Sequence, residues 1–273
     1  MRTRDCLLRL TALVLSVLAA SAASSEGAGW ADARVVGPFV CQADFPLAGV
    51  DRFLDELAPL QADLVRILGV SVAREPIQLY FFHDKSTYSR YLSRYLPNVP
   101  YRRALYVKSQ GQGRVFAYKS ADFEVDLRHE CTHALLHASL PMVPLWLDEG
   151  LATYFEMPAD QRPGGHPNLS SIRSSLRWGS PPRLENLERK ANLSEMGRTE
   201  YRDSWAWVHF MLHGPAEAHE ELMAFLADIQ AGSPPGLLSA RLQQRVPNLL
   251  PSFVEHFRVP KDAHGSAPHH FMP

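Results

Sequence analysis

The first part of the chain carries the hydrophobic pattern of a small sheet with two helices. Apolar residues at helical spacing predict a long helix over residues 51–68, and a tyrosine-rich helix is predicted over 87–96. Gly111 and Gly113 separate the last two apolar runs, which predicts a hairpin. Strands are predicted at 34–40, 77–82, 104–107 and 114–118.

Helical spacing dominates the rest of the chain. Asp122 can cap a helix that runs to His137, and Pro141 and Pro144 end it. A second helix is predicted over 145–155. Further helices are predicted at 169–177, 184–190, 204–212 and 216–229, after a loop at 158–167. A small sheet followed mainly by helices predicts an α+β fold.

The N-terminal pattern is that of a secretory signal peptide over residues 1–22. Arg2 and Arg4 precede an apolar stretch, which Arg9 interrupts, and an Ala-x-Ala cleavage site lies at 20–22. The apolar stretch is shorter than the roughly 20 residues that a membrane-spanning helix needs. We therefore expect an exported, periplasmic or secreted protein, without stable membrane insertion after cleavage.

The composition of the remaining chain predicts three segments. We expect a flexible lead-in at 23–33, one domain at 34–259 and a disordered tail at 260–273. The 28 basic and 29 acidic residues are mixed throughout, so nothing indicates nucleic acid as a partner. Cys41 and Cys131 could form a disulfide in an oxidising compartment, or could equally be buried free thiols.

The helix after Asp122 carries two histidines four residues apart, in the motif His129-Glu130-Cys131-Thr132-His133. On a helical wheel His133 lies about 40° from His129, and Glu130 about 100°. The opposite side is apolar and carries Leu127, Cys131, Ala134, Leu135 and Ala138. Both imidazoles can therefore bind one metal ion, with Glu130 beside them to hold a water, as in the metalloprotease signature H-E-x-x-H.

A catalytic zinc site has three protein ligands and one open position, so a third ligand must come from elsewhere. His137 lies about 12 Å from His129 along an unbroken helix, too far to share one ion. Glu149 on the second helix is the better candidate, and Asp148 is its rival. Glu156 shares a face with Glu149 and could accept the second N–H of a ligand histidine.

These two motifs resemble the gluzincin group of zinc peptidases. The segment 146–152, W-L-D-E-G-L-A, is similar to the W-L-N-E-G-x-A motif of aminopeptidase N relatives, whose glutamate binds zinc. Pro144 and the segment 146–156 resemble more closely the bacterial peptidase-MA-like domains of unknown function. The resemblance implies a zincin-like fold, with its site between sheet and helices. It also implies one Zn²⁺ ion bound by His129, His133 and Glu149.

The resemblance extends in one further place. Tyr201 opens a segment similar to the one in which aminopeptidase relatives carry an oxyanion-stabilising tyrosine, although it could equally be a packing residue. His209 and His213 on the same helix are weaker candidates for this role. No counterpart of the relatives' G-x-M-E-N segment precedes His129, so aminopeptidase specificity does not transfer.

The sequence therefore predicts a secreted zinc metallopeptidase that hydrolyses peptides or proteins, with Glu130 as the general base. We also expect that the strand at 114–118 could pair with an extended substrate. The alternative is a peptidase-like binding module that keeps zinc without cutting. A hydrolase of non-peptide amides is a third possibility.

Overall fold

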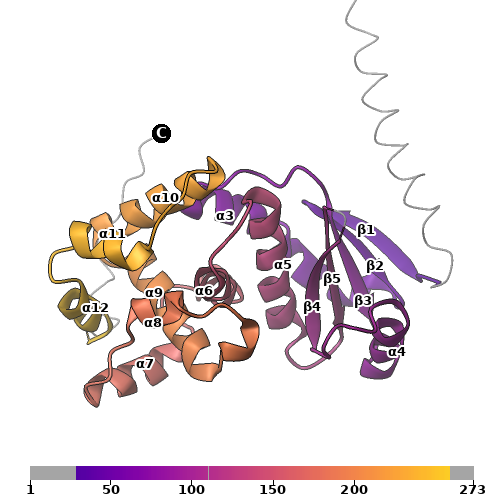
Figure 1. The fold of residues 1–273 in the computed structure, drawn as a ribbon. Helices are drawn as coiled ribbons and strands as arrows, with labels where there is room; N and C mark the ends of the chain where they lie inside the picture. Colours follow the sequence, from indigo (N-terminus) through magenta and orange to yellow (C-terminus); the bar gives the residue numbers. More distant parts are fainter. Residues whose placement is uncertain (1–28, 110, 259–273) are drawn as a thin grey trace, which may run out of the picture.

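The computed structural model describes residues 29–109 and 111–258, and its chain path is drawn in Figure 1. The expected signal peptide at 1–22 and the expected tail at 260–273 lie outside the described residues. Within the described part of the chain, no helix is both long and apolar enough to cross a membrane. The predicted α+β class is confirmed, because a sheet forms first and helices follow it.

One mixed five-stranded sheet has the order β1-β2-β3-β5-β4. The pairs β1–β2 and β4–β5 are antiparallel, whereas β2–β3 and β3–β5 are parallel. The strands are β1 (Asp32–Val36), β2 (Phe39–Ala43), β3 (Ile77–Phe82), β4 (Ala104–Ser109) and β5 (Gln112–Tyr118). Because β5 lies between β3 and β4, its expected pairing with a substrate is wrong, and β4 is the strand at this edge of the sheet.

Helices make up most of the remaining structure. Those that precede β4 are η1 (Leu47–Val50), α2 (Asp51–Leu57), α3 (Leu60–Leu68) and α4 (Lys85–Tyr95). Those that follow β5 are α5 (Phe123–Ser139), α6 (Leu145–Phe155), α7 (Asn168–Arg177), α8 (Leu184–Glu188), η2 (Leu193–Glu195), α9 (Arg198–His213), α10 (Ala216–Gln230), α11 (Leu238–Arg245) and α12 (Leu249–Arg258). The sequence pattern had not predicted α11 and α12.

Two predicted elements are each divided in the structure. The predicted strand at 34–40 is a hairpin, because Gly37 adopts a positive φ of 55° and turns the chain between β1 and β2. The predicted helix at 51–68 is split at Pro59, which cannot donate a backbone hydrogen bond to a preceding turn. The first strand begins at Asp32, inside the expected lead-in.

Helix α6 lies between α5 and α9 and is the most deeply buried helix of the C-terminal half (Figure 1). Every residue from Trp146 to Phe155 is buried. A methyl group on Gly150 would lie 2.7 Å from the Ser204 carbonyl oxygen, so glycine allows α9 to approach closely. Two carboxylates, those of Asp148 and Glu149, are carried into the core by this helix, and each needs a partner there.

Helix α5 packs against β4 and β5 with the apolar side that the sequence pattern predicted. Leu127, Cys131, Ala134 and Leu135 are all buried there. The thiols of Cys41 and Cys131 are buried and free. The opposite side of α5 faces α6, so the sheet, α5 and α6 form successive layers with the two site helices in contact.

Candidate metal centre

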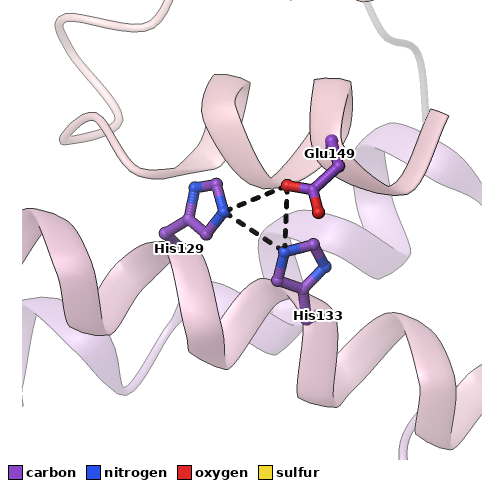
Figure 2. Close-up of side chains that lie close together, drawn as sticks. All are labelled: His129, His133 and Glu149. Carbon is purple, nitrogen blue, oxygen red and sulfur yellow. Dashed lines mark hydrogen bonds and ion pairs between the residues drawn. The ribbon is translucent and has the colours of Figure 1, made fainter. Parts of the chain in front are cut away.

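Three candidate ligand atoms meet between α5 and α6 (Figure 2). The Nε2 atoms of His129 and His133 are 3.2 Å apart. The Oε2 atom of Glu149 lies 3.5 Å from the first and 3.6 Å from the second. The structure therefore brings together the three residues that the sequence predicted as metal ligands.

The spacing of these three atoms fits a tetrahedral zinc ion. Zinc bonds of about 2.0–2.2 Å to nitrogen and oxygen give ligand–ligand distances of about 3.3–3.6 Å in a tetrahedral site. Oε2 of Glu149 is buried without a well-aligned hydrogen bond among the described residues. A cation held between the three atoms would satisfy this oxygen, so the residues present fit zinc.

The charges at the centre also favour a cation. Burial alone would raise the pKa of Glu149, but the His129 and His133 imidazoles outweigh it and lower this pKa to about 2. Burial would lower the pKa of His129, but Glu149 and Glu156 outweigh it and raise this pKa to about 9. The carboxylates thus favour protonated imidazoles. A metal ion can take the place of these protons.

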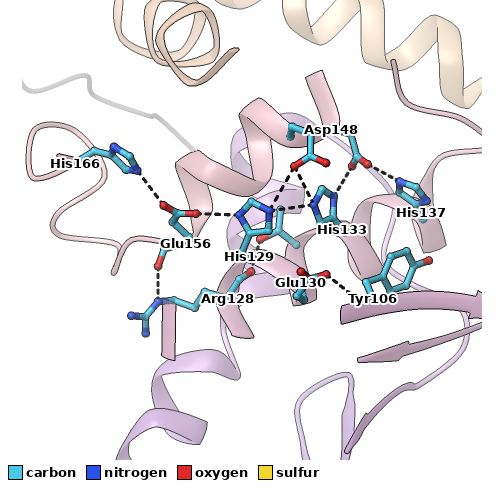
Figure 3. A network of polar contacts seen from close by, with 11 residues as sticks. Tyr106, Arg128, His129, Glu130, His133, His137, Asp148, Glu156 and His166 are labelled. Atoms are coloured by element: carbon cyan, nitrogen blue, oxygen red, sulfur yellow. Dashed lines mark hydrogen bonds and ion pairs between the residues drawn. The ribbon is translucent and has the colours of Figure 1, made fainter. Parts of the chain in front are cut away.

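The outer nitrogen of His129 is held by Glu156, as the sequence allowed (Figure 3). Its Nδ1 atom lies 2.9 Å from Oε2 of Glu156, whose other oxygen lies 3.1 Å from Nε2 of His166. The Arg128 side chain donates to the Glu156 backbone carbonyl at 2.7 Å and so ties the end of α6 to α5. His129 is therefore held on its outer side by a buried network.

Asp148 occupies the corresponding place beside His133. Its Oδ1 lies 3.0 Å from Nδ1 of His133, and its Oδ2 lies 2.8 Å from Nε2 of His137. The first contact is an ion-pair contact without the alignment of a good hydrogen bond. Asp148 contacts the outer nitrogen of a candidate ligand, whereas Glu149 meets the Nε2 atoms of both histidines.

Glu130 points away from the three ligand atoms and toward the sheet (Figure 3). Its Oε2 accepts a hydrogen bond of 2.7 Å from the backbone N–H of Tyr106, which lies on the edge strand β4. The carboxylate is half-buried. It is thus not one of the three candidate ligands, and in this structure its carboxylate is tied to β4.

Tyr201 lies in the first turns of α9 and reaches the centre through its phenol. The hydroxyl interacts with the carboxylate of Glu149 and the guanidinium of Arg102. Burial and the Glu149 carboxylate both raise the pKa of Tyr201, so the phenol keeps its proton at neutral pH. The structure therefore brings the fifth predicted site residue to the same centre.

No family model matches this chain, and no curated protein matches it. The resemblance to gluzincins therefore stays a prediction that rests on the motif residues. The function must be argued from the geometry of His129, Glu130, His133, Glu149 and Tyr201.

Several residues at the centre had no sequence signal that would identify them. His166 lies in a loop with no motif, and the backbone of Tyr106 carries no side-chain signature. Arg102 lies about a hundred residues before Tyr201 in the chain. A contact between such distant positions could be found only from the fold itself.

His209 faces a different part of the molecule. Its Nδ1 lies 2.9 Å from Nε2 of His256, and its Nε2 lies 3.0 Å from the Pro163 carbonyl oxygen. His213, one turn further along α9, contacts the Tyr154 hydroxyl at 2.7 Å. Both histidines therefore have structural partners instead of the oxyanion role considered from sequence.

His209 predicts a pH dependence of stability. Burial lowers its pKa well below the ordinary value, and His213, His256 and His166 lower it further. Below about pH 6.5 the unfolded chain then binds one proton more than the folded chain, so acidification costs up to about 1.4 kcal/mol per pH unit. Urea unfolding at pH 7, 6 and 5 should show that the free energy of unfolding falls less with acidification in His209→Gln than in wild type. Equal losses in both proteins would contradict this assignment.

Proposed function

We propose that this protein is a zinc-dependent metallopeptidase of the gluzincin type, with a zincin-like fold and one Zn²⁺ ion. The observation that carries the proposal is the triangle of His129 Nε2, His133 Nε2 and Glu149 Oε2, with sides of 3.2–3.6 Å. Glu130, next to His129 on the same helix and not itself a candidate ligand, makes hydrolysis the reaction that the residues support best. Residues 1–22 support export to the periplasm or the exterior.

Each residue has one role in the proposed reaction. Zinc at such a centre lowers the pKa of a coordinated water to about 7, which makes hydroxide available at neutral pH. Glu130 accepts the proton of the attacking water and then passes it to the leaving amine. Since Tyr106 occupies Oε2 of Glu130, the other oxygen takes this proton.

The edge strand β4 supports a peptide as the substrate. An extended chain can add to a free sheet edge through backbone hydrogen bonds. The backbone N–H of Tyr106 points outward to Glu130, so Ala104 and Lys108 direct their backbone groups to the same side. A peptide paired through the backbones of Ala104 and Lys108 would therefore run past Glu130, which itself accepts from Tyr106. A structure with a bound peptide inhibitor that does not contact β4 would contradict this arrangement.

Tyr201→Phe should lower kcat about 100-fold, because it removes one donor to the oxyanion that forms on the substrate carbonyl. The ring that packs at the start of α9 is kept, but the lost hydroxyl also contacts Glu149, so zinc affinity is measured as well and kcat is compared with zinc in excess. Steady-state kinetics together with metal analysis of the purified variant measure both quantities. An unchanged kcat would assign Tyr201 a packing role instead.

The proposed function is tested by cleavage of a peptide library, read by mass spectrometry. Zinc-loaded protein should cut peptides, a chelator should stop cleavage, and added zinc should restore it. Matched samples treated with chelator and then with magnesium serve as the control. A zinc-loaded, folded sample that cuts no peptide would contradict the proposal.

The second candidate is a zinc-retaining binding module without activity. The hydrogen bond from Tyr106 favours it, because this bond holds one oxygen of the base in the structure described. This candidate predicts zinc binding at the same three residues but no cleavage of any peptide. It also predicts that Glu130 can be replaced without loss of function.

A further inference from the structure

The strongest unassigned feature is a buried histidine outside both motifs. His166 lies in the loop between α6 and α7, and its side chain is only 5% exposed. Its ring stacks on the indole of Trp205 at 4.8 Å between centroids. Both ring nitrogens have partners, so the histidine is held in one orientation by packing and by polar contacts together.

These partners define which nitrogen of His166 carries the proton. The backbone N–H of Asn168 donates to Nδ1 of His166 at 3.0 Å, so Nδ1 must be an acceptor. In the neutral ring Nε2 then carries the hydrogen and donates it to Oε1 of Glu156 at 3.1 Å. A backbone amide, whose proton cannot move elsewhere, thus sets the tautomer of His166 and makes it a donor to Glu156.

The hydrogen bonds continue from Glu156 to His129 at the candidate metal centre. With Oε1 of Glu156 occupied by His166, Oε2 accepts from Nδ1 of His129 at 2.9 Å. In the neutral ring that binds a metal ion, His129 then carries its hydrogen on the outer nitrogen and has a lone pair on Nε2. That lone pair faces His133 Nε2 and Glu149 Oε2, the other two candidate ligand atoms.

We propose that His166 is a positioning residue for the metal centre, which acts through Glu156 to fix the orientation and tautomer of His129. The proposal rests on the zinc site of the proposed function. Without the donor on His166, Glu156 can rotate away from His129 or point its free oxygen at the ligand cluster. Loss of such an outer contact lowers metal affinity by about 10–100-fold.

The other side of the centre is built differently. On that side Asp148 contacts His137, which is only partly buried, with 34% of its side chain exposed. The contact between Asp148 and His133 also lacks good alignment. His133, His137 and Asp148 could themselves surround a cation. However, His133 can offer a lone pair on only one nitrogen while neutral, so this group competes with the His129 centre.

The test compares His166→Phe with His166→Gln. Phenylalanine keeps the stacking on Trp205 but removes the donor to Glu156, whereas the glutamine side-chain nitrogen can occupy the place of Nε2. Zinc affinity is measured on full-length protein by competition with a chromophoric chelator, with zinc alone as the probe. The same phenylalanine replacement at the exposed His83 controls for general loss of a histidine.

We expect a 10–100-fold weaker zinc affinity for His166→Phe and an affinity within about threefold of wild type for His166→Gln. The absorption spectrum of the Co²⁺-loaded protein should change in His166→Phe only. Long-range ¹H–¹⁵N correlations of the wild type should place the His166 proton on Nε2. If His166→Phe is folded and binds zinc as wild type does, the proposal is overturned.

Two further outcomes are separable. Wild-type protein that binds no zinc would overturn the proposed function itself, whereas unequal affinities without peptide cleavage would still support the role of His166. Should His166→Phe fail to fold, His166→Gln is compared with His166→Asn, which places its amide nitrogen near Nδ1. Equal zinc affinities of these two variants would overturn the proposal.

Discussion

Glu130→Gln should lower the rate of peptide cleavage by about 1000-fold while zinc remains bound. Glutamine has nearly the same shape and can still accept the hydrogen bond from Tyr106, but it cannot take a proton from water. The three candidate ligand atoms of His129, His133 and Glu149 are untouched by the change. Cleavage kinetics and zinc content of the same purified sample measure the two expectations together.

Glu124→Gln is the matched control, because Glu124 lies on the same helix and is exposed. Its cleavage rate should equal that of wild type. An active Glu130→Gln protein would exclude Glu130 as the base. If wild type and Glu130→Gln are both inactive but bind zinc equally, the binding module becomes the better reading.

Glu149→Ala should lose zinc, with an affinity lower by more than the roughly 100-fold that an outer contact costs. Two histidines remain, but a catalytic zinc site needs a third protein ligand. Zinc at 100 times its Kd should stabilise wild type by about 2.7 kcal/mol against unfolding, and the variant should gain almost nothing. Thermal unfolding with and without zinc measures the difference.

Asp148→Asn separates the two rival carboxylates of α6. If Glu149 is the ligand, this variant should keep zinc, because asparagine has nearly the same shape as Asp148 and leaves the three candidate ligand atoms unchanged. If zinc is lost in Asp148→Asn and kept in Glu149→Ala, then Asp148 is the ligand and Glu149 is not. Both variants change a buried residue of the same helix, so each is a control for the other.

The two site helices could be predicted closely from sequence because local signals define them. The predicted helix at 145–155 matches α6, and the apolar side of α5 packs where the helical wheel placed it. Asp122 does precede α5, but its side chain binds Arg103 and not the helix backbone as a cap. The general position of a helix start was thus predictable, whereas the partner of its carboxylate was not.

What the sequence could not give depends on contacts between distant segments. Gly37 and Pro59 were visible in the sequence, yet the apolar periodicity around each of them was strong enough to hide a turn. The position of β4 at the sheet edge follows from the pairing of β5 with β3. His166 has no motif at all, and only the stacking on Trp205 and the contact with Glu156 reveal its place.

The complete burial of α6 has a consequence for how this molecule can be altered. A helix whose residues from Trp146 to Phe155 all lie in the core leaves almost no position that can change without loss of folding. For the proposed peptidase, a change of specificity is therefore better sought on β4 at Tyr106, Val107 and Lys108, which are half-buried or exposed. Directed evolution that spares α6 and the buried Ala104 and Leu105, and varies the other positions of this edge, would explore specificity at little cost in stability.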